Sequence, residues 1–195
     1  MAKFTGVHHL AFATGDMDAT IRYWRDLLGM RLVAGLGNGK YRHYFFELSE
    51  TDMVAFFEWP ETEKAILKDH GVPVAGPFVF DHVSFGVPDS DTLWELRDKI
   101  EAAGFWVSEV IDHGFIHSIY TFDPNNIPIE FSVNVRNIDL RMRPVNKDRY
   151  PSTEAEKGPD SQPGRWPAPT RRTSVSERMV FPGEGLIFSE TTDKV

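Results

Sequence analysis

Two histidines in matched surroundings are the residues whose type and spacing most clearly suggest chemistry. His9 opens the stretch HLAF near the N-terminus, and His82 opens the similar stretch HVSF. Glu130 lies in an otherwise apolar stretch, residues 127–133, where a carboxylate is costly unless a cation or hydrogen-bond donors satisfy it. Two imidazoles and one carboxylate are the ligands of a metal centre with open positions. The pattern therefore predicts a metal site held by His9, His82 and Glu130.

The residue types also limit which metal this site would hold. Two histidines and a carboxylate with open positions are the arrangement of non-haem Fe(II) enzymes, so we expect Fe(II) first. The same set could hold Mn(II), Ni(II) or Zn(II), and ligand type alone does not choose among them. The chain has no cysteine, so thiolate ligands, disulfides and a cysteine nucleophile are excluded. In a strand, alternate residues share a face, which puts Ala11 beside His9 and Ser84 beside His82. These small neighbours leave room for a bound group.

The elements that must position these residues are predicted twice in the same order. Strand-like stretches at residues 4–14 and 80–87 are each followed by a helical pattern that ends at a glycine, Gly29 or Gly104. The strands predicted after the helices are residues 31–34, 41–48 and 53–59 in the first module and 105–111, 116–122 and 127–135 in the second. We therefore predict an α+β fold of two βαβββ modules, about residues 4–60 and 79–135.

The periodic pattern stops near residue 136. This predicts a domain over residues 1–136 and an irregular, Pro- and Ser-rich extension over residues 137–195. From residue 134 on, Lys plus Arg number 11 and Asp plus Glu number 9, so this part has a charge of +2. Because the whole chain has a net charge of −8, the residues before it have a charge of −10. The extension is either an arm on its own domain or a partner subunit, or a partly disordered tail. Apolar residues such as Trp166 and Phe181 favour the arm.

Charge and hydropathy exclude several classes of partner. The net charge of −8 argues against nucleic acid and against anionic membranes. No stretch approaches the roughly 20 apolar residues of a membrane helix, and the N-terminus lacks the apolar run of a signal peptide. We therefore expect a cytoplasmic protein with a small-molecule substrate.

The opening HLAF and GDMDATIRYWRDLLGM, the closing DPNNIPIEF and the repeated βαβββ order resemble the vicinal oxygen chelate superfamily. This group includes glyoxalase I, bleomycin-binding and fosfomycin-resistance proteins, and extradiol ring-cleaving dioxygenases. The resemblance covers about residues 4–135. It implies that the two modules form one curved eight-stranded mixed sheet around a metal cavity, and a homodimer is the default expectation.

Within that superfamily, the second module resembles type I extradiol dioxygenases. The residues at matching places are Ile111, His113, Ile119, Tyr120, Asp123, Pro124 and Glu130. Asn126 stands where the family signature has Gly or Pro, and Asn also tolerates a left-handed turn. The resemblance implies a non-haem Fe(II) dioxygenase that cleaves a catecholic aromatic substrate with O2.

The resemblance also implies roles for three further residues. Tyr120 would hydrogen-bond the bound substrate, and His113 would act as the acid–base group, with His117 as its competitor. His43 resembles the acid–base histidine of the preceding module. A register slip of one residue would put Tyr44, in place of His43, in the cavity.

Three alternatives stay open. A glyoxalase I-like lyase or isomerase would need a fourth ligand from the end of the first module. Alignment puts Phe56 at that place, and Glu58 lies two residues further on the same face. The second alternative is a metal-free, ligand-binding protein of the resistance type. The third is a fosfomycin-type transferase, which would share the three ligands but would need a cationic cluster for a phosphonate, for which Lys40 and Arg42 are the only near candidates. The sequence also leaves open whether the site lies within one chain or between subunits.

Overall fold

The computed structural model describes residues 5–76, 80–162 and 166–189, and the chain divides into two units, Met1–Ile138 and Asp139–Val195. The elements of the first module are β1 His9–Thr14, α1 Met17–Ile21, its π-helical continuation η1 Arg22–Leu27, β2 Leu32–Gly37, β3 Arg42–Glu47 and β4 Met53–Glu58. Those of the second are β5 Val83–Gly86, α2 Ser90–Ala102, β6 Ile111–Asp112, β7 Ile116–Phe122 and β8 Pro128–Asn134. The predicted βαβββ order is therefore present twice.

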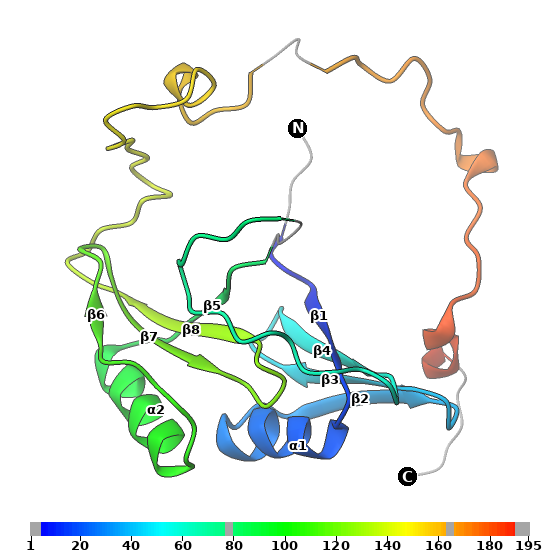
Figure 1. Ribbon diagram of the computed structural model, residues 1–195. Coiled ribbons are helices and arrows are strands. Elements are labelled where there is room, and N and C mark those ends of the chain that lie inside the picture. The colour runs from blue at the N-terminus through cyan, green and yellow to red at the C-terminus, as the bar shows by residue number, and fades with distance from the viewer. Residues whose placement is uncertain (1–4, 77–79, 163–165, 190–195) are drawn as a thin grey trace. The chain divides into compact units, whose positions relative to one another are not determined.

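The strands form two four-stranded mixed sheets, in the orders β1-β4-β3-β2 and β5-β8-β7-β6 (Figure 1). β1 runs parallel to β4, and β5 runs parallel to β8. The other neighbouring strands are antiparallel. The α+β class and the two modules are confirmed. β1 and β5 are edge strands of separate sheets, and no ladder among the described residues joins them. The two sheets therefore do not make one continuous eight-stranded sheet.

Matched signals begin and end the two long helical segments. The carboxylate of Asp16 accepts a hydrogen bond from the N–H of Ala19 at 2.9 Å, and Asp89 caps α2 in the same way. Such caps satisfy N–H groups that have no partner within the helix. Gly29 and Gly104 follow the helices, both at a φ of +81°, a left-handed conformation that glycine adopts without steric cost.

The predicted strand at residues 105–111 is much shorter than expected. Only an isolated bridge at Val107 and the two residues of β6 pair with β7. Between them, the Ser108 hydroxyl accepts a hydrogen bond from the Tyr120 N–H at 2.9 Å. A serine side chain that bonds the neighbouring backbone replaces a ladder bond, so the regular strand breaks there.

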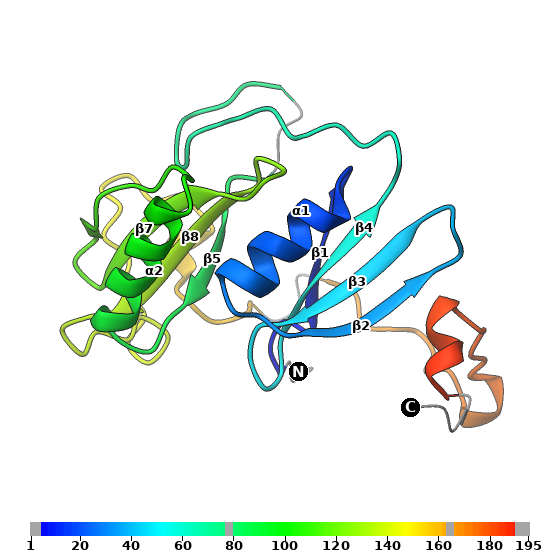
Figure 2. The ribbon, with the colours of Figure 1, turned by 90° about the horizontal axis from the view of Figure 1, so that it is seen from below.

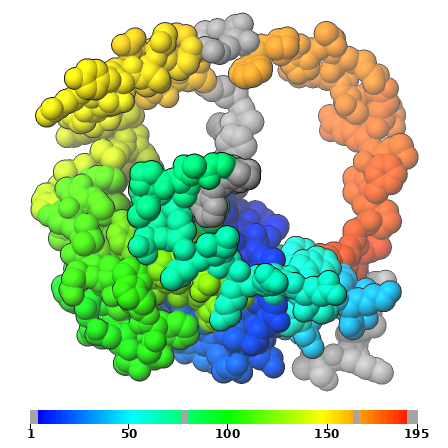
Figure 3. All heavy atoms as spheres, in the orientation of Figure 1, coloured from blue at the N-terminus to red at the C-terminus, as the bar shows by residue number. Residues whose placement is uncertain are grey.

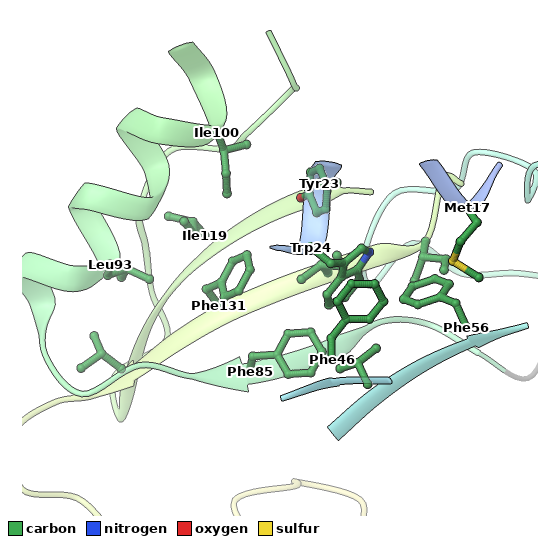
Figure 4. Close-up of a cluster of buried hydrophobic side chains, with 14 residues drawn as sticks. Met17, Tyr23, Trp24, Phe46, Phe56, Phe85, Leu93, Ile100, Ile119 and Phe131 are labelled. Atoms are coloured by element: carbon green, nitrogen blue, oxygen red, sulfur yellow. The ribbon is translucent and has the colours of Figure 1, made fainter. Parts of the chain in front are cut away.

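Both helices lie on the same side of the sheets (Figure 2) and cover one core shared by the two modules (Figure 4). Trp24 of η1 is fully buried and packs against Phe56 of the first module and Phe85 of the second, with ring centroids 5.3 and 5.9 Å apart. Burial of large aromatic side chains is the main stabilising term at such a contact. The helix-side faces of both sheets are therefore already occupied by this core.

A buried polar cluster closes the junction between the modules. Thr14 donates a hydrogen bond to Asn125 at 2.7 Å, and Asn125 donates to Thr20 at 3.2 Å. The indole N–H of Trp24 donates to Asp123 at 3.2 Å. Burial raises the pKa of Asp123 above its ordinary value. Because these buried groups have partners, the junction avoids the cost of unsatisfied polar atoms.

The described part of the second unit contains three short 3-10 helices, Ala155–Lys157, Val175–Glu177 and Glu184–Ser189. Its described residues contain no β-strand. Trp166 and Phe181, whose apolar character favoured an arm, are exposed. The arm stays a prediction. None of the described helices in either unit has the length and apolar character needed to cross a membrane.

Candidate metal centre

His82 and Glu130 lie together on one face of the second sheet. Glu130 alternates along β8 with core residues Ile129 and Phe131, so its side chain points away from the helices. It pairs across the ladder with Ser84, two residues after His82. This register brings Nε2 of His82 to 3.0 Å from Oε2 of Glu130. A histidine nitrogen and a carboxylate oxygen at this separation fit a divalent metal ion as two of its ligands.

Three serine hydroxyls surround the carboxylate of Glu130. Ser84 and Ser132 lie 2.7 Å apart, and Ser118 and Ser132 lie 3.1 Å apart, measured between hydroxyl oxygens. Burial acts to raise the pKa of Glu130, but hydrogen bonds from these serines and from Tyr120 outweigh it and hold the pKa below its ordinary value. Glu130 is therefore ionised at neutral pH, as a metal ligand must be. Sequence reasoning did not identify Ser118 of β7 and Ser132 of β8, although both lie on the same face of the sheet as Glu130.

Asp81 orients the imidazole of His82. Its Oδ1 lies 2.5 Å from Nδ1 of His82 and accepts the N–H of Gly71 at 2.9 Å, while Oδ2 pairs with Lys68. The Lys68 ammonium, the His82 ring and the Gly71 N–H hold the pKa of Asp81 well below its ordinary value. A carboxylate on one ring nitrogen is the usual support of a metal-binding histidine, because it leaves the other nitrogen for the metal. Sequence reasoning missed both Asp81 and Lys68.

Tyr120 and His113, the two predicted catalytic residues of the second module, lie beside this pair, and their roles stay predictions. Nε2 of His113 lies 2.8 Å from the phenol oxygen of Tyr120. Burial, with the nearby charge of Glu130, raises the pKa of Tyr120 to about 12, so the phenol keeps its proton at neutral pH. His117 instead lies 3.6 Å from Asp112, so of the two competing histidines, His113 is the one hydrogen-bonded to Tyr120.

A cavity of about 470 Å³ opens beside these groups. Its lining residues are Asp69, His70, Gly71, His82, Trp106, His113 and Tyr120. His70 was not singled out by the sequence. Its Nε2 lies 3.0 Å from the carbonyl oxygen of Ile129, and burial lowers its pKa. The cavity thus combines an apolar indole with imidazole and phenol groups, as small-molecule sites commonly do.

His9 lies apart from the pair on the second sheet. Its side chain is exposed, with Nδ1 2.9 Å from Nδ1 of His8 and its ring edge-on to Phe45 at 5.6 Å. Within the described residues, no group of three or more His, Cys, Asp or Glu side chains is arranged to hold a metal ion. The structure therefore brings together two of the three predicted ligands, and the complete set stays a prediction.

His43 belongs to a row of aromatic rings on the His9 face of the first sheet. It is buried and stacks on Phe57 with ring centroids 3.5 Å apart, and the Phe45 ring lies tilted at a centroid distance of 4.3 Å. Trp59 stacks on Phe57 at 5.6 Å. Tyr44 pairs with the core residue Phe56 and faces the helices, so His43 is the one of the two residues that lies on the His9 face. Its acid–base role stays a prediction.

The register of the first sheet also locates the place of a fourth ligand. Ala55 pairs with Ala11, two residues after His9, just as Glu130 pairs with Ser84, two residues after His82. Ala55 therefore takes the position that Glu130 takes in the second module.

The alignment that put Phe56 at the fourth-ligand place was thus wrong by one residue. Phe56 is fully buried and packs against Trp24. Glu58 shares the helix-side face of Phe56, where it accepts a hydrogen bond from the N–H of Met17 at 2.8 Å and pairs with Arg42. These contacts use Glu58 to fasten the start of α1, and they place it on the opposite face from His9.

The fold and the site together define a class of protein: two βαβββ modules that share one core, with a supported histidine–carboxylate pair on the face opposite the helices. The family model of the Glyoxalase/Bleomycin resistance protein/Dioxygenase superfamily matches residues 6–131. The chain belongs to this superfamily.

Individual relatives refine this comparison. A lactoylglutathione lyase of Haemophilus influenzae is 24% identical over 131 residues, which cover 65% of this chain and 90% of the relative. A probable lactoylglutathione lyase of Vibrio parahaemolyticus is 26% identical over 135 residues, covering 65% of this chain and 88% of the relative. A solved glyoxylase/bleomycin resistance protein/dioxygenase domain from a Frankia species has a TM-score of 0.57 at 20% identity, covering 68% of this chain and 99% of its own. The relatives' names do not support the expected closeness to extradiol dioxygenases.

Proposed function

We propose that this protein is a metal-dependent lyase or isomerase that acts without O2 on a substrate presenting two adjacent oxygen atoms. The observation that carries the proposal is the 3.0 Å approach of His82 Nε2 to Glu130 Oε2, with Nδ1 of His82 held by Asp81. The names of the two lactoylglutathione lyases favour this reaction class over ring cleavage. Ni(II) or Zn(II) is then the expected metal, in place of Fe(II).

His82 and Glu130 would hold the ion, with His9 as the third protein ligand. When bound, a divalent ion polarises a carbonyl oxygen and stabilises negative charge that develops on it. Tyr120 keeps its proton and can donate a hydrogen bond to a substrate oxygen. His113, hydrogen-bonded to that phenol and exposed, is placed to exchange a proton with solvent.

We further propose that His9 of a second copy completes the ligand set. The helix-side faces of both sheets already share one core, so the opposite faces are the ones available to another molecule. On those faces the edge-strand residues are exposed, among them His9, Ala11, Ser84 and Gly86. The predicted homodimer would cover them and join the two half-sites.

The experiment is turnover by full-length protein loaded anaerobically with Ni(II) or Zn(II). The substrate pair is glutathione with methylglyoxal, and formation of the lactoylglutathione thioester is followed by absorbance. We expect turnover without O2 that Glu130→Gln abolishes and that the matched variant Glu58→Gln retains, since Glu58 lies on the helix side. Metal binding without thioester formation would point to another substrate of this class. Absence of metal binding would favour the ligand-binding alternative.

A second candidate is an extradiol-type dioxygenase, which specific observations favour. Ala55 stands where a four-ligand site would need a donor, which leaves three predicted protein ligands, and the Tyr120–His113 contact forms beside Glu130. The row of rings from Trp59 to Phe45 offers a flat apolar wall for an aromatic substrate. Oxygen uptake with catechols by the Fe(II)-loaded protein, lost in Glu130→Gln, would select this candidate.

A further inference from the structure

The connector between the modules, residues 60–76, is fastened to the second module at several points. The N–H of Ala65 donates to the carbonyl of Asn125 at 3.0 Å, and the Asn126 side chain donates to the carbonyl of Ala65 at 2.8 Å. Further along, His70 bonds the Ile129 carbonyl at 3.0 Å. In Figure 3 the connector, blue-green, lies over the yellow-green residues of β8. The connector is therefore packed against the second module and hydrogen-bonded to it.

The connector also contacts Asp81, the carboxylate that supports His82. Lys68, whose side chain is only 10% exposed, pairs with Oδ2 of Asp81. The N–H of Gly71 donates to Oδ1 of the same carboxylate at 2.9 Å. That oxygen lies 2.5 Å from Nδ1 of His82. Two donors from one segment thus fix both oxygens of Asp81, and Asp81 fixes the plane of the His82 ring.

We propose that Lys68 and Asp81 are positioning residues, through which the connector sets the orientation and metal affinity of His82. The inference rests on the proposed function, because it takes His82 to be a metal ligand. It adds that the segment joining the modules determines how well the second half-site binds the ion. Burial of the Lys68 side chain holds its ammonium in place beside Asp81, whose own side chain is 45% exposed. Loss of such outer partners typically weakens metal binding about 10- to 100-fold.

The test measures Zn(II) affinity of the full-length protein by competition with a chelating dye. We expect Asp81→Asn and Lys68→Met each to weaken Zn(II) binding by about 10- to 100-fold. Lys68→Arg, which keeps the positive charge, should retain most of the wild-type affinity. Lys64→Met is the matched control, because Lys64 is an exposed lysine of the same connector, and it should bind Zn(II) as the wild type does. Melting temperatures without metal check that each variant is folded.

A second readout reports on His82 directly. In the Zn(II)-loaded protein, the hydrogen-bonded Nδ1 proton of His82 should give a resolved NMR signal that His82→Ala removes and Asp81→Asn loses or shifts. Wild-type affinity together with an unchanged signal in Asp81→Asn would overturn the inference. If His82→Ala and Glu130→Gln leave Zn(II) affinity unchanged, the proposed metal centre itself fails. If those two lose affinity and the Asp81 and Lys68 variants keep it, only the positioning role fails.

Discussion

Ala55 occupies in the first module the place that Glu130 occupies in the second. Each pairs across a parallel ladder with the residue two positions after the matched histidine, Ala11 after His9 and Ser84 after His82. Both modules therefore have a histidine at the matched place, and only the second has a carboxylate opposite it. The proposed lyase site would therefore have three protein ligands, one fewer than the four of glyoxalase I, and its remaining metal positions would be open.

Ala55→Glu should create a metal-responsive position. Ala55 is fully buried, so a carboxylate there should lower the free energy of unfolding of the metal-free protein by about 3 kcal/mol. Added Zn(II) should then raise the melting temperature more than it does in the wild type, because the ion compensates the buried charge. Ala55→Gln, of similar size and without charge, is the control. An equal Zn(II) response in Ala55→Glu and the wild type would contradict the assigned register.

His70 should make the fold sensitive to mild acid. Burial is the largest effect and lowers the pKa of His70, while the hydrogen bond to the Ile129 carbonyl raises it. The smaller effects are those of His82, which lowers this pKa, and of Asp81 and Glu130, which raise it. The ordinary pKa of about 6.5 applies in the unfolded chain. A lowered folded pKa means that the unfolded state binds the proton first. The stabilising contribution is thus complete above about pH 6.5 and declines as pH falls towards the folded value.

Urea unfolding at pH 7 and pH 5.5 measures this effect. His70→Asn should reduce the loss of unfolding free energy between the two pH values, since the amide does not titrate. His117→Asn, at a histidine on β7 that contacts Asp112, is the control and should keep the wild-type loss. An unchanged loss in His70→Asn would show that other groups cause the acid sensitivity.

Trp24→Phe should weaken the junction between the modules. The change removes the hydrogen bond to Asp123 and leaves space in a core where Trp24 touches Phe56 and Phe85. We expect a loss of about 1–3 kcal/mol in unfolding free energy, measured by urea denaturation. Trp94→Phe on α2, where Trp94 is 48% exposed, should stay within about 0.5 kcal/mol of the wild type. Similar losses in the two variants would argue against a special role of this junction.

Gly15→Ala should be destabilising for a reason of space. A Cβ added at Gly15 would lie 2.2 Å from the carbonyl oxygen of Thr62, a backbone atom at the start of the connector. The backbone must shift to relieve this contact, which should cost about 1–3 kcal/mol. Gly86→Ala is the comparison, because its Cβ would meet nothing within 4 Å. Thermal unfolding of both variants checks the difference, and equal melting temperatures would refute it.

Much of the second half-site was predictable because it depends on local periodicity. Alternation along β8 separates Glu130 from its core neighbours, and the match between the two histidine stretches points to His82. Tyr120 and His113 came from resemblance to a signature, and the structure puts them in contact beside Glu130. The helix ends at Gly29 and Gly104 were readable for the same local reason, since a left-handed C-terminal residue favours glycine.

The connector residues were not predictable, because nothing periodic marks them. Lys68 and His70 lie in a segment without a strand or a helix, and their partners, Asp81 and Ile129, lie 13 and 59 residues away in sequence. Only folding brings them together. The one-residue error at Phe56 has a related cause: within an apolar stretch such as Met53–Glu58, many registers bury the same number of apolar atoms.

The sequence by itself therefore determined the two modules, their helices and the histidine–carboxylate pair, because strand alternation and helix caps are local properties of neighbouring residues. Only the tertiary structure decided that Ala55 matches Glu130, that Glu58 fastens a helix, and that Lys68 and Asp81 support His82. Those relations depend on ladder register and on contacts across long stretches of chain, and these are set by the packing of the whole core.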